Sequence, residues 1–381
     1  MIQWFLLFSL FANIVLSDTE CPLVTSIGDR RSDKSKLRLV QYNVEWLFID
    51  YYSTIDCPGN GCTWKNVSAA EIHLSYVSKV IHDLNPDIIN FCEIEGCDEL
   101  NMLKSSLNDD TYMPYLKKGT DTSTGQNVGM LTRVDPVVSL YRTEDRYDYP
   151  IYGSSCGYTG TGSTGVSKHY ITEFKLSNMN IALIGAHFVA IPTDSSRCAQ
   201  REGQASVLQP IIYNYISKGY EVILIGDLND FDGVVLDVNS NKPTSQVLSI
   251  LKGAFGEYKG KYELTSVAEN VKQSERYSDW YDSDNNCNTQ SDKDYSMIDH
   301  VLVTSGIKNK ILDVPNYIKI DVDGIEHLIL EGGKELLKNK DLKEISIELD
   351  TMLTKENNQI IKLIFVFWRK TIEPFVGLSI T

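Results

Sequence analysis

Short apolar stretches rich in β-branched residues recur along this chain, separated by polar segments and by patterns typical of helices. Seven of them have the length and composition of strands: 37–42, 87–91, 128–131, 170–174, 181–184, 222–225 and 298–303. One helical pattern opens with the capping box from Ser68 to Glu71 and runs toward Leu84, and another covers 197–216. This mixed order predicts a layered α/β protein.

The amino-terminal residues predict a secreted protein. Residues 1–17 are typical of a signal peptide, because an uncharged apolar run from Trp4 to Leu16 ends in small or branched residues. The run is shorter than the ~20 residues of a spanning helix, which favours cleavage over a membrane anchor. We therefore expect no transmembrane segment after cleavage. Asn66 is the one acceptor for N-glycosylation, in agreement with secretion.

Cysteine usage points to an oxidising compartment. Eight cysteines follow the predicted cleavage point, and their even number predicts four disulfides. They are Cys21, Cys57, Cys62, Cys92, Cys97, Cys156, Cys198 and Cys287. Cys57 with Cys62 and Cys92 with Cys97 are near enough in sequence to close small loops, which leaves four for long-range bridges. Sequence does not give the connectivity, and the lack of a CxxC pair disfavours a zinc site.

The charge balance limits how the chain can meet a polyanion. With 381 residues, 42% of them hydrophobic, it can bury a large core. Its formal net charge of −15 makes the surface as a whole repel nucleic acid and acidic membranes. A phosphate substrate must therefore be held by local cations, and a bound divalent metal can supply that charge.

Two polar segments, 153–167 and 278–294, have the composition of long surface loops. The first contains a formal GxGxxG match at 160–165. No strand pattern leads into it and no helical pattern follows, so a flexible loop is favoured over a dinucleotide site.

Polar residues close several of the predicted strands, where an α/β sheet normally gathers a site. They are Asn43, Glu45, Glu93, His187, Asp227 and Asn229. Any one of them could be a strand-end cap or a turn residue. Their recurrence at successive strand ends predicts a shared site.

These residues and their neighbours resemble the motifs of the endonuclease/exonuclease/phosphatase superfamily, to which DNase I belongs. The resemblance covers about 37–312 and rests on Tyr42-Asn43-Val44-Glu45, Cys92-Glu93-Ile94-Glu95, the segment 127–133, Gly185-Ala186-His187, Arg201 with Gln204, Gly226-Asp227-Leu228-Asn229 and the segment 298–303. It implies a four-layered α/β sandwich, two packed mixed β-sheets flanked by helices, with the site at one sheet edge. The signal would occupy 1–17 and this domain 18–312.

The resemblance also implies a magnesium site. Glu93 would bind Mg²⁺, with Mn²⁺ or Ca²⁺ as alternatives, and Asn43 would help to hold metal or phosphate. Glu45 would not bind the metal itself but would lie next to the residues that do. Mg²⁺ prefers hard oxygen donors and keeps several waters, so one or two carboxylates suffice.

Three further residues would act on a phosphoester. Asp227 would align or deprotonate the attacking water, and Asn229 would hydrogen-bond the scissile phosphate. His187 would donate to a phosphate oxygen as charge builds in the transition state. Hydrolysis of a phosphoester needs a cation, an activated water and fixed donors, and these residue types suit it.

The late part of the chain departs from the superfamily pattern, which shows an Ile-Asp-Tyr or Ile-Asp-His strand and then a final Ser-Asp-His. Asp299-His300 is the only Asp-His pair, with Ile298 before it and no nearby proline. These flanks favour the penultimate motif, in which Asp299 orients a catalytic histidine that the chain does not supply. His300 is then structural.

After residue 312 the pattern changes. A strand-helix-strand unit over about 314–351, within the segment 313–381, resembles the middle of an FkbM-type methyltransferase. The glycine-rich turn that would bind S-adenosylmethionine is absent, so we expect no such cofactor. An ordinary β-α-β extension is the alternative. Loss of the last superfamily strand would leave a neighbouring strand unpaired, unless the apolar segment 360–367 takes its place. Another possibility is that the junction after residue 312 is a gene fusion or an artefact of the gene model.

The sequence thus predicts a secreted, Mg²⁺-dependent phosphodiester hydrolase that acts on nucleic acid or phospholipid, impaired by the missing Asp-His motif. The first alternative is a non-catalytic binding protein of the same fold, and the second is an FkbM-type methyltransferase. Substrate and oligomeric state do not follow from the sequence.

Overall fold

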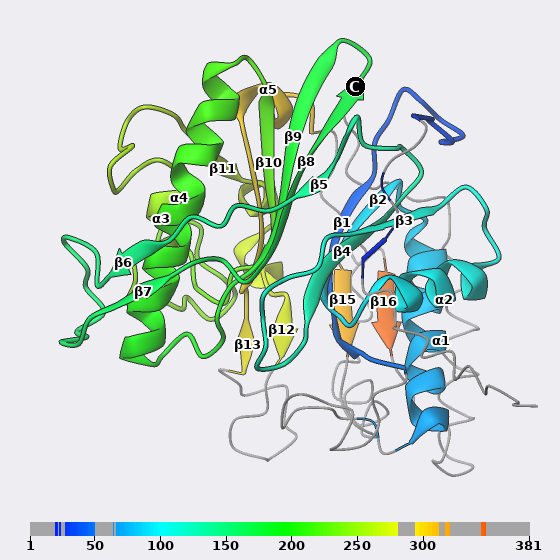
Figure 1. Cartoon of the computed structure of the whole chain (residues 1–381), viewed down its shortest axis with the longest axis horizontal. Coiled ribbons are helices and arrows are strands. Elements are labelled where there is room, and N and C mark those ends of the chain that lie inside the picture. The colour runs from blue at the N-terminus through cyan, green and yellow to red at the C-terminus, as the bar shows by residue number, and fades with distance from the viewer. Residues whose placement is uncertain are drawn as a thin grey trace, which may run out of the picture.

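A computed structural model describes residues 20–21, 23, 27–49, 64, 66–280 and 294–311, with the backbone alone at 317–320 and 344–347. Its centre consists of two β-sheets packed face to face, with helices on both outer faces (Figure 1). The predicted four-layered α/β sandwich is therefore confirmed. All seven predicted strands are present, each within a few residues of its expected bounds.

The smaller sheet has four strands in the order β1-β2-β4-β3. They are β1 (Leu39–Leu47), β2 (Ile88–Ile94), β4 (Asn127–Thr132) and β3 (Met113–Leu116). β1 and β2 are parallel, whereas β4 runs antiparallel to both of its neighbours. β1 ends this order, so within the described residues no further strand pairs with its outer edge.

The larger sheet has six strands in the order β11-β14-β10-β9-β8-β5. They are β11 (Thr265–Ser266), β14 (Asp299–Val303), β10 (Glu221–Asp227), β9 (Met179–His187), β8 (Lys168–Leu176) and β5 (Val138–Tyr141). β9 and β10 are parallel and the other pairs are antiparallel. β10 therefore lies between a parallel and an antiparallel neighbour.

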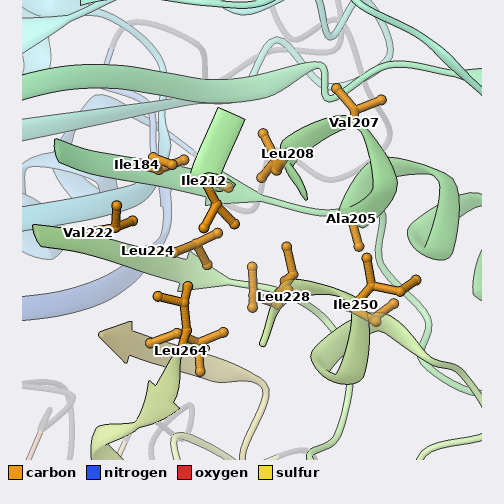
Figure 2. Close-up of a cluster of buried hydrophobic side chains, with 14 of the residues drawn as sticks. Ile184, Ala205, Val207, Leu208, Ile212, Val222, Leu224, Leu228, Ile250 and Leu264 are labelled. Carbon is orange, nitrogen blue, oxygen red and sulfur yellow. The ribbon is translucent and has the colours of Figure 1, made fainter. Parts of the chain in front are cut away.

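Alternation along each strand builds the layers. In β10, Ile223 and Ile225 face the other sheet, while Val222 and Leu224 face the helices. Both faces are buried, so the strand reads as a continuous apolar run. Figure 2 shows the outer layer, where Leu224 lies next to Ile212 of the covering helix, in the buried cluster that also includes Leu208.

Helices α1 (Val67–Leu84) and α2 (Cys97–Leu107) cover the four-stranded sheet, and α3 (Ser195–Ser217) and α4 (Val247–Leu251) cover the six-stranded sheet (Figure 1). Helix α1 begins one residue before the predicted Ser68 cap. Asn66 is the N-cap, and its side chain accepts from the Ala69 N–H at 3.0 Å. The capping-box prediction was wrong because the earlier Asn already satisfies a free N–H of the first turn.

Short elements complete the described part. β6 (Tyr147–Tyr149) pairs with β7 (Gly162–Thr164), β12 (Asp279–Trp280) pairs with β13 (Tyr295–Ser296), and short helices lie at Val267–Asn270, Gln273–Glu275 and Ser305–Lys308 (α5). The predicted loop 153–167 thus contains a strand, β7. It is also tied to α3 by the Cys156–Cys198 disulfide. The segment 153–167 is therefore held at two points, by the pairing of β7 with β6 and by the disulfide.

The predicted cysteine pairing is wrong for the Cys92–Cys97 pair. Cys97 bonds to Cys21, with their Cα atoms 5.0 Å apart, and Cys92 is a buried free thiol. Cys92 faces the core between the sheets, whereas Cys97 lies on the outer, helical side of the same sheet. A short separation in sequence does not bring such opposed side chains together. Burial raises the pKa of the Cys92 thiol, which keeps it protonated.

Several predictions lie outside the described residues. They concern the signal at 1–17, Cys57, Cys62, Cys287, the polar run 281–293 and the segment 360–367. In the carboxyl-terminal segment the structure describes two parallel strands, β15 (Tyr317–Ile320) and β16 (Glu344–Ile347). Within the described part of the chain, no helix has the length and apolar character needed to cross a membrane.

Candidate active site

The carboxyl ends of β1, β2, β9 and β10 meet the amino ends of β4, β8 and β14 at one end of the sandwich. The pairing register places three predicted site residues in one row. Asp227 on β10 lies opposite His187 on β9 and opposite Asp299 on β14. Regular sheet geometry therefore brings together residues that are far apart in the chain.

Alternation also sets the direction of these side chains. On β9, Ile181 and Leu183 face the other sheet, and His187 follows with the same parity. On β1, Leu39 faces the same gap, and Asn43 shares its parity. The residues at the strand ends thus extend the row of apolar side chains that fills the space between the sheets.

The side-chain amide of Asn43 joins the two sheets. It donates to Glu93 Oε1 at 3.2 Å and to Asp227 Oδ2 at 3.0 Å. His187 Nε2 lies 3.9 Å from Glu93 Oε1 and 3.8 Å from Asp227 Oδ2. Four of the predicted residues therefore surround one small volume.

A β-bulge turns Glu93 into this volume. Its φ of 67° lies in the left-handed region, and the pairing of β2 with β4 shifts between Cys92 and Ile94. Without the bulge, Glu93 would share the helical face with Phe91; with it, Ile94 takes that face instead. The Trp46 N–H donates to Glu93 Oε2 at 3.2 Å and helps to hold the carboxylate. Left-handed backbone at a non-glycine residue is concentrated at functional sites.

Asn229 has a similar backbone, with a φ of 50°. Its N–H donates to Asp227 Oδ1 at 2.9 Å, and its side-chain amide donates to the Phe188 carbonyl at 3.3 Å. Gly226, which precedes Asp227, lets β10 lie this close to β9, because a Cβ at that position would lie 1.8 Å from the Ala186 carbonyl oxygen. Asn229 thus lies beside the other four residues and anchors Asp227.

Glu45 is placed differently from its prediction. Its side chain is exposed, and the N–H of its backbone, at a φ of 45°, donates to Asn43 Oδ1 at 3.1 Å. Glu45 therefore orients the Asn43 amide through its main chain. That bond leaves the Asn43 amide N–H groups pointing at the two carboxylates.

The site carries excess negative charge. Burial raises the pKa of Asp227 well above its usual range, and the nearby Asp299 and Glu93 charges add to the rise. Burial, together with the Lys168 charge, holds the pKa of His187 well below its usual value. The imidazole is therefore neutral near pH 7, so its short distances to the carboxylates are not ion pairs.

Lys168 is a site residue that the sequence did not reveal. It begins β8 opposite His187, and its Nζ lies 3.5 Å from His187 Nε2 and 3.1 Å from Gln126 Oε1. Asp121 Oδ2 is 3.9 Å from the same nitrogen. Lys168 is only 8% exposed, so its ammonium group is held at the site and does not extend into the solvent. The antiparallel register of β8 with β9 was the only signal, and it is not visible in the sequence.

His300 faces away from the site. Its Nε2 lies 2.9 Å from the Asp230 carbonyl oxygen, on the helical side of the sheet, and its side chain is 2% exposed. Asp299, its neighbour, faces the gap and accepts from Gln41 Nε2 at 2.9 Å. These opposite directions agree with the interpretation of His300 as structural.

Arg201 and Gln204 of α3 hold the loops that follow His187 and Asn229. Arg201 is fully buried, and its Nε lies 2.9 Å from Asp230 Oδ2. Its other nitrogens donate to the carbonyls of Ile191 and Pro192, at 2.9 and 2.8 Å. Gln204 Oε1 accepts from the Val189 N–H at 3.0 Å. A fixed network of this kind keeps both strand ends in place.

The oxygen donors at the site have the chemistry of a divalent-cation site. Within the described residues, no three His, Cys, Asp or Glu side chains form a ready cluster of ligands. Glu93 and Asp227 are nevertheless hard oxygen donors, and Mg²⁺ needs few protein ligands because it keeps its waters. The Asn43 carbonyl oxygen accepts from the Glu45 N–H instead, and the Asn43 amide N–H groups face the two carboxylates. Burial and the neighbouring Asp299 and Glu93 charges raise the pKa of Asp227, and a bound cation would offset that negative charge. These residues fit a hydrated divalent cation.

No family model and no curated protein matches this chain. The resemblance of 314–351 to FkbM-type methyltransferases therefore stays a prediction. Among solved structures, the human Nocturnin catalytic domain is similar at 14% identity and a TM-score of 0.42, over 74% of this chain and 86% of that one.

Two other solved structures are similar to the same degree. A Bacteroides thetaiotaomicron mannosyl-6-phosphatase aligns at 18% identity and a TM-score of 0.41, over 71% of this chain and 85% of that one. ANGEL2, a 2′,3′-cyclic phosphatase, aligns at 9% identity and a TM-score of 0.41, over 74% and 86%. Likeness at this level does not identify a function, and the fold is defined by the strand order itself.

Proposed function

We propose that this protein is a metal-dependent phosphodiester hydrolase. The observation that carries the proposal is the Asn43 amide, which holds Glu93 and Asp227 together beside His187. A structural role alone does not account for a buried carboxylate, Asp227, and a partly buried one, Glu93, that converge at strand ends next to a neutral imidazole. Such groups cost stability and are concentrated at sites of acid–base chemistry.

Each residue has a task in hydrolysis. The oxygen of a water molecule attacks phosphorus while Asp227 accepts the proton of the water, and the ester P–O bond breaks with its electron pair on the leaving oxygen, which takes a proton from solvent water. Burial and the Asp299 and Glu93 charges raise the pKa of Asp227, which makes its carboxylate a stronger base. Neutral His187 and Asn229 donate hydrogen bonds to phosphate oxygens, and Asn43 keeps the carboxylates in place.

Glu93 would hold Mg²⁺ or, as alternatives, Mn²⁺ or Ca²⁺, and the Asn43 amide would hold the Glu93 carboxylate in place for the ion. The bound ion supplies positive charge for the phosphate oxygens in the transition state. The overall charge of −15 repels an anionic substrate. Lys168 provides a local positive charge at the site that would attract it. The substrate class is therefore a phosphodiester of nucleic acid or phospholipid.

The proposal is tested with bis-p-nitrophenyl phosphate, in Mg²⁺ and in EDTA. We expect product with Mg²⁺, loss of product with EDTA, and recovery on adding Mn²⁺. Equal rates in both buffers would remove the metal from the proposal. Absence of product from this ester, DNA, RNA and sphingomyelin vesicles would remove the hydrolase.

One observation favours a second candidate, a non-catalytic binding protein of the same fold. Of the five histidines that the structure describes, only His187 lies at the site. Tight binding of a phosphodiester without turnover, measured by calorimetry, would decide for this candidate. A null titration with S-adenosylmethionine would dispose of the methyltransferase alternative.

Secretion belongs to the same proposal. The two disulfides, Cys21–Cys97 and Cys156–Cys198, are compatible with an oxidising compartment. Expression in a secreting cell line should yield protein in the medium that begins after residue 17 and carries glycan on Asn66. Retention of residues 1–17 in the recovered protein would contradict the signal assignment.

A further inference from the structure

A row of polar side chains crosses the apolar core between the two sheets and ends at the site. The Tyr170 hydroxyl on β8 donates to Asn90 Oδ1 at 2.8 Å, and Asn90 Nδ2 on β2 donates to Gln41 Oε1 at 2.6 Å. Gln41 Nε2 on β1 then donates to Asp299 Oδ1 at 2.9 Å. The row, which we call the Gln41 relay, thus links four strands from two sheets.

The relay lies in surroundings that penalise polar groups. Tyr170 and Asn90 are fully buried, and the same layer contains Cys92, Leu183 and Ile225. Removal of an amide or a hydroxyl from water costs free energy unless a hydrogen bond replaces the water. Each link of the relay is made, so the cost is offset, but an all-apolar layer would have avoided it. The relay therefore needs a reason beyond packing.

The direction of the bonds supplies one. A phenol donates to an amide carbonyl, that amide donates to a second amide carbonyl, and the second amide donates to a carboxylate. An ionised carboxylate accepts hydrogen bonds and donates none, so it is a natural end for a row of donors. Every link points toward Asp299, and the relay fixes which oxygen of Asp299 faces Gln41.

An independent observation comes from Gly185 on β9. A Cβ at this position would lie 2.4 Å from Asn90 Oδ1 and 2.4 Å from Tyr170 Cε1. Any side chain at Gly185 would therefore push apart the first link of the relay. The absence of a side chain two residues before His187 leaves room for that link.

We propose that Gln41, held by Asn90 and Tyr170, is a positioning residue that fixes the Asp299 carboxylate opposite Asp227 for hydrolysis. The inference rests on the proposed function. Gln41 does not touch the substrate; it acts through Asp299, whose register partner on β10 is Asp227. A wandering Asp299 carboxylate would change the charge that Asp227 experiences during the reaction.

The test is a double-mutant cycle on kcat. Gln41→Met keeps the length of the side chain and removes its hydrogen bonds, and Asp299→Ala removes the acceptor at the end of the relay. We expect Gln41→Met to lower kcat ~10-fold with KM within ~2-fold, because positioning acts on the reaction step. In the Asp299→Ala background the same change should have no further effect. Tyr170→Phe should give a smaller loss in the same direction.

Gln209→Met is the matched control. Gln209 is also a buried glutamine, and its amide donates to the carbonyls of Ile250 and Phe255, at 2.9 and 2.7 Å, in the outer helical layer. Its loss should lower stability and leave kcat unchanged. If Gln41→Met behaves like this control, or lowers kcat equally with and without Asp299, the proposal is overturned.

Failure of the proposed function would look different. If the wild-type protein has no turnover, the same cycle is read from urea unfolding of the full chain. Non-additive losses for Gln41 and Asp299 would then retain the relay and discard the hydrolase. Additive losses would discard the relay. Tyr170→Phe, which removes one oxygen from the core, covers the case in which Gln41→Met fails to fold.

Discussion

The two sheets place their site residues by different means. On the six-stranded sheet, His187, Asp227 and Asp299 follow from plain strand register, with Asp227 opposite both of the others. On the four-stranded sheet, Glu93 reaches the site through a bulge with a φ of 67°, and Asn43 is oriented by the N–H of Glu45. Register is held by many bonds, whereas a bulge depends on few. We therefore expect the site residues of the six-stranded sheet to keep their positions when a neighbouring side chain is changed. Those of the four-stranded sheet should be displaced more easily.

The greatest loss of activity is expected from Asp227 of the six-stranded sheet, because this residue itself takes part in the proposed reaction. Asp227→Asn should lower kcat ~10³-fold or more, because the base is lost while the ladder stays intact. The raised pKa of Asp227 means that the folded state disfavours its charge, so stability falls as pH rises above the usual carboxyl range. The variant should therefore unfold at a higher urea concentration at pH 7 in EDTA. Asp145→Asn, at an exposed carboxylate, is the control and should change neither quantity.

Acid should weaken the six-stranded sheet through His169. Burial and the Arg142 charge lower its pKa to about 4, while it accepts from the Thr143 N–H at 3.0 Å. The unfolded chain takes up the proton below its own pKa of about 6.5, so stability is present above pH 6.5 and is lost as pH falls toward 4. The loss should be about 3 kcal/mol in urea unfolding.

His169→Gln should remove that part of the pH dependence. His82→Gln, at a histidine whose side chain is 78% exposed, should leave the pH profile as it is. The wild-type protein and both variants could instead show the same dependence of unfolding free energy on pH. Acid would then unfold the chain through groups other than His169, and the six-stranded sheet would not be the acid-sensitive part.

The Asn43 amide is where the two halves meet, and its removal tests their dependence on each other. Asn43→Ala should lower kcat ~10²-fold, since Glu93 and Asp227 both lose a donor. Asn101→Ala, at an exposed position of α2, serves as control. If the loss is no greater than in the control, the four-stranded half does not support the reaction.

The smallest expected effect concerns packing between the sheets. Gly185→Ala should lower the free energy of unfolding by ~2 kcal/mol, because its Cβ would overlap Asn90 and Tyr170. At Gly233 the nearest atom to a new Cβ is 3.3 Å away, so Gly233→Ala should be tolerated in the same urea experiment. Equal stability of the two variants would indicate that the gap between the sheets adapts to extra volume.

Much of the fold was predictable because the strand signal is local. Apolar β-branched runs gave all seven predicted strands, and the patterns before Leu84 and over 197–216 gave α1 and α3. The errors share a cause. The Cys92–Cys97 pairing, the Ser68 cap and the free loop at 153–167 were judged from neighbours in sequence. Each was decided by contacts outside the window.

The layers and the polar ends of the strands follow from the order of the amino acids, since alternation of apolar residues fixes which faces can be buried. Three features depend on how the strands assemble: the bulge that turns Glu93, the position of Lys168 against His187, and the bond from Gln41 to Asp299. The physical reason is that side-chain direction after a bulge, and contact across antiparallel or facing strands, depend on register. Register is set by neighbouring strands that are distant in the chain, and the contact between the facing sheets from Gln41 to Asp299 joins residues 258 positions apart.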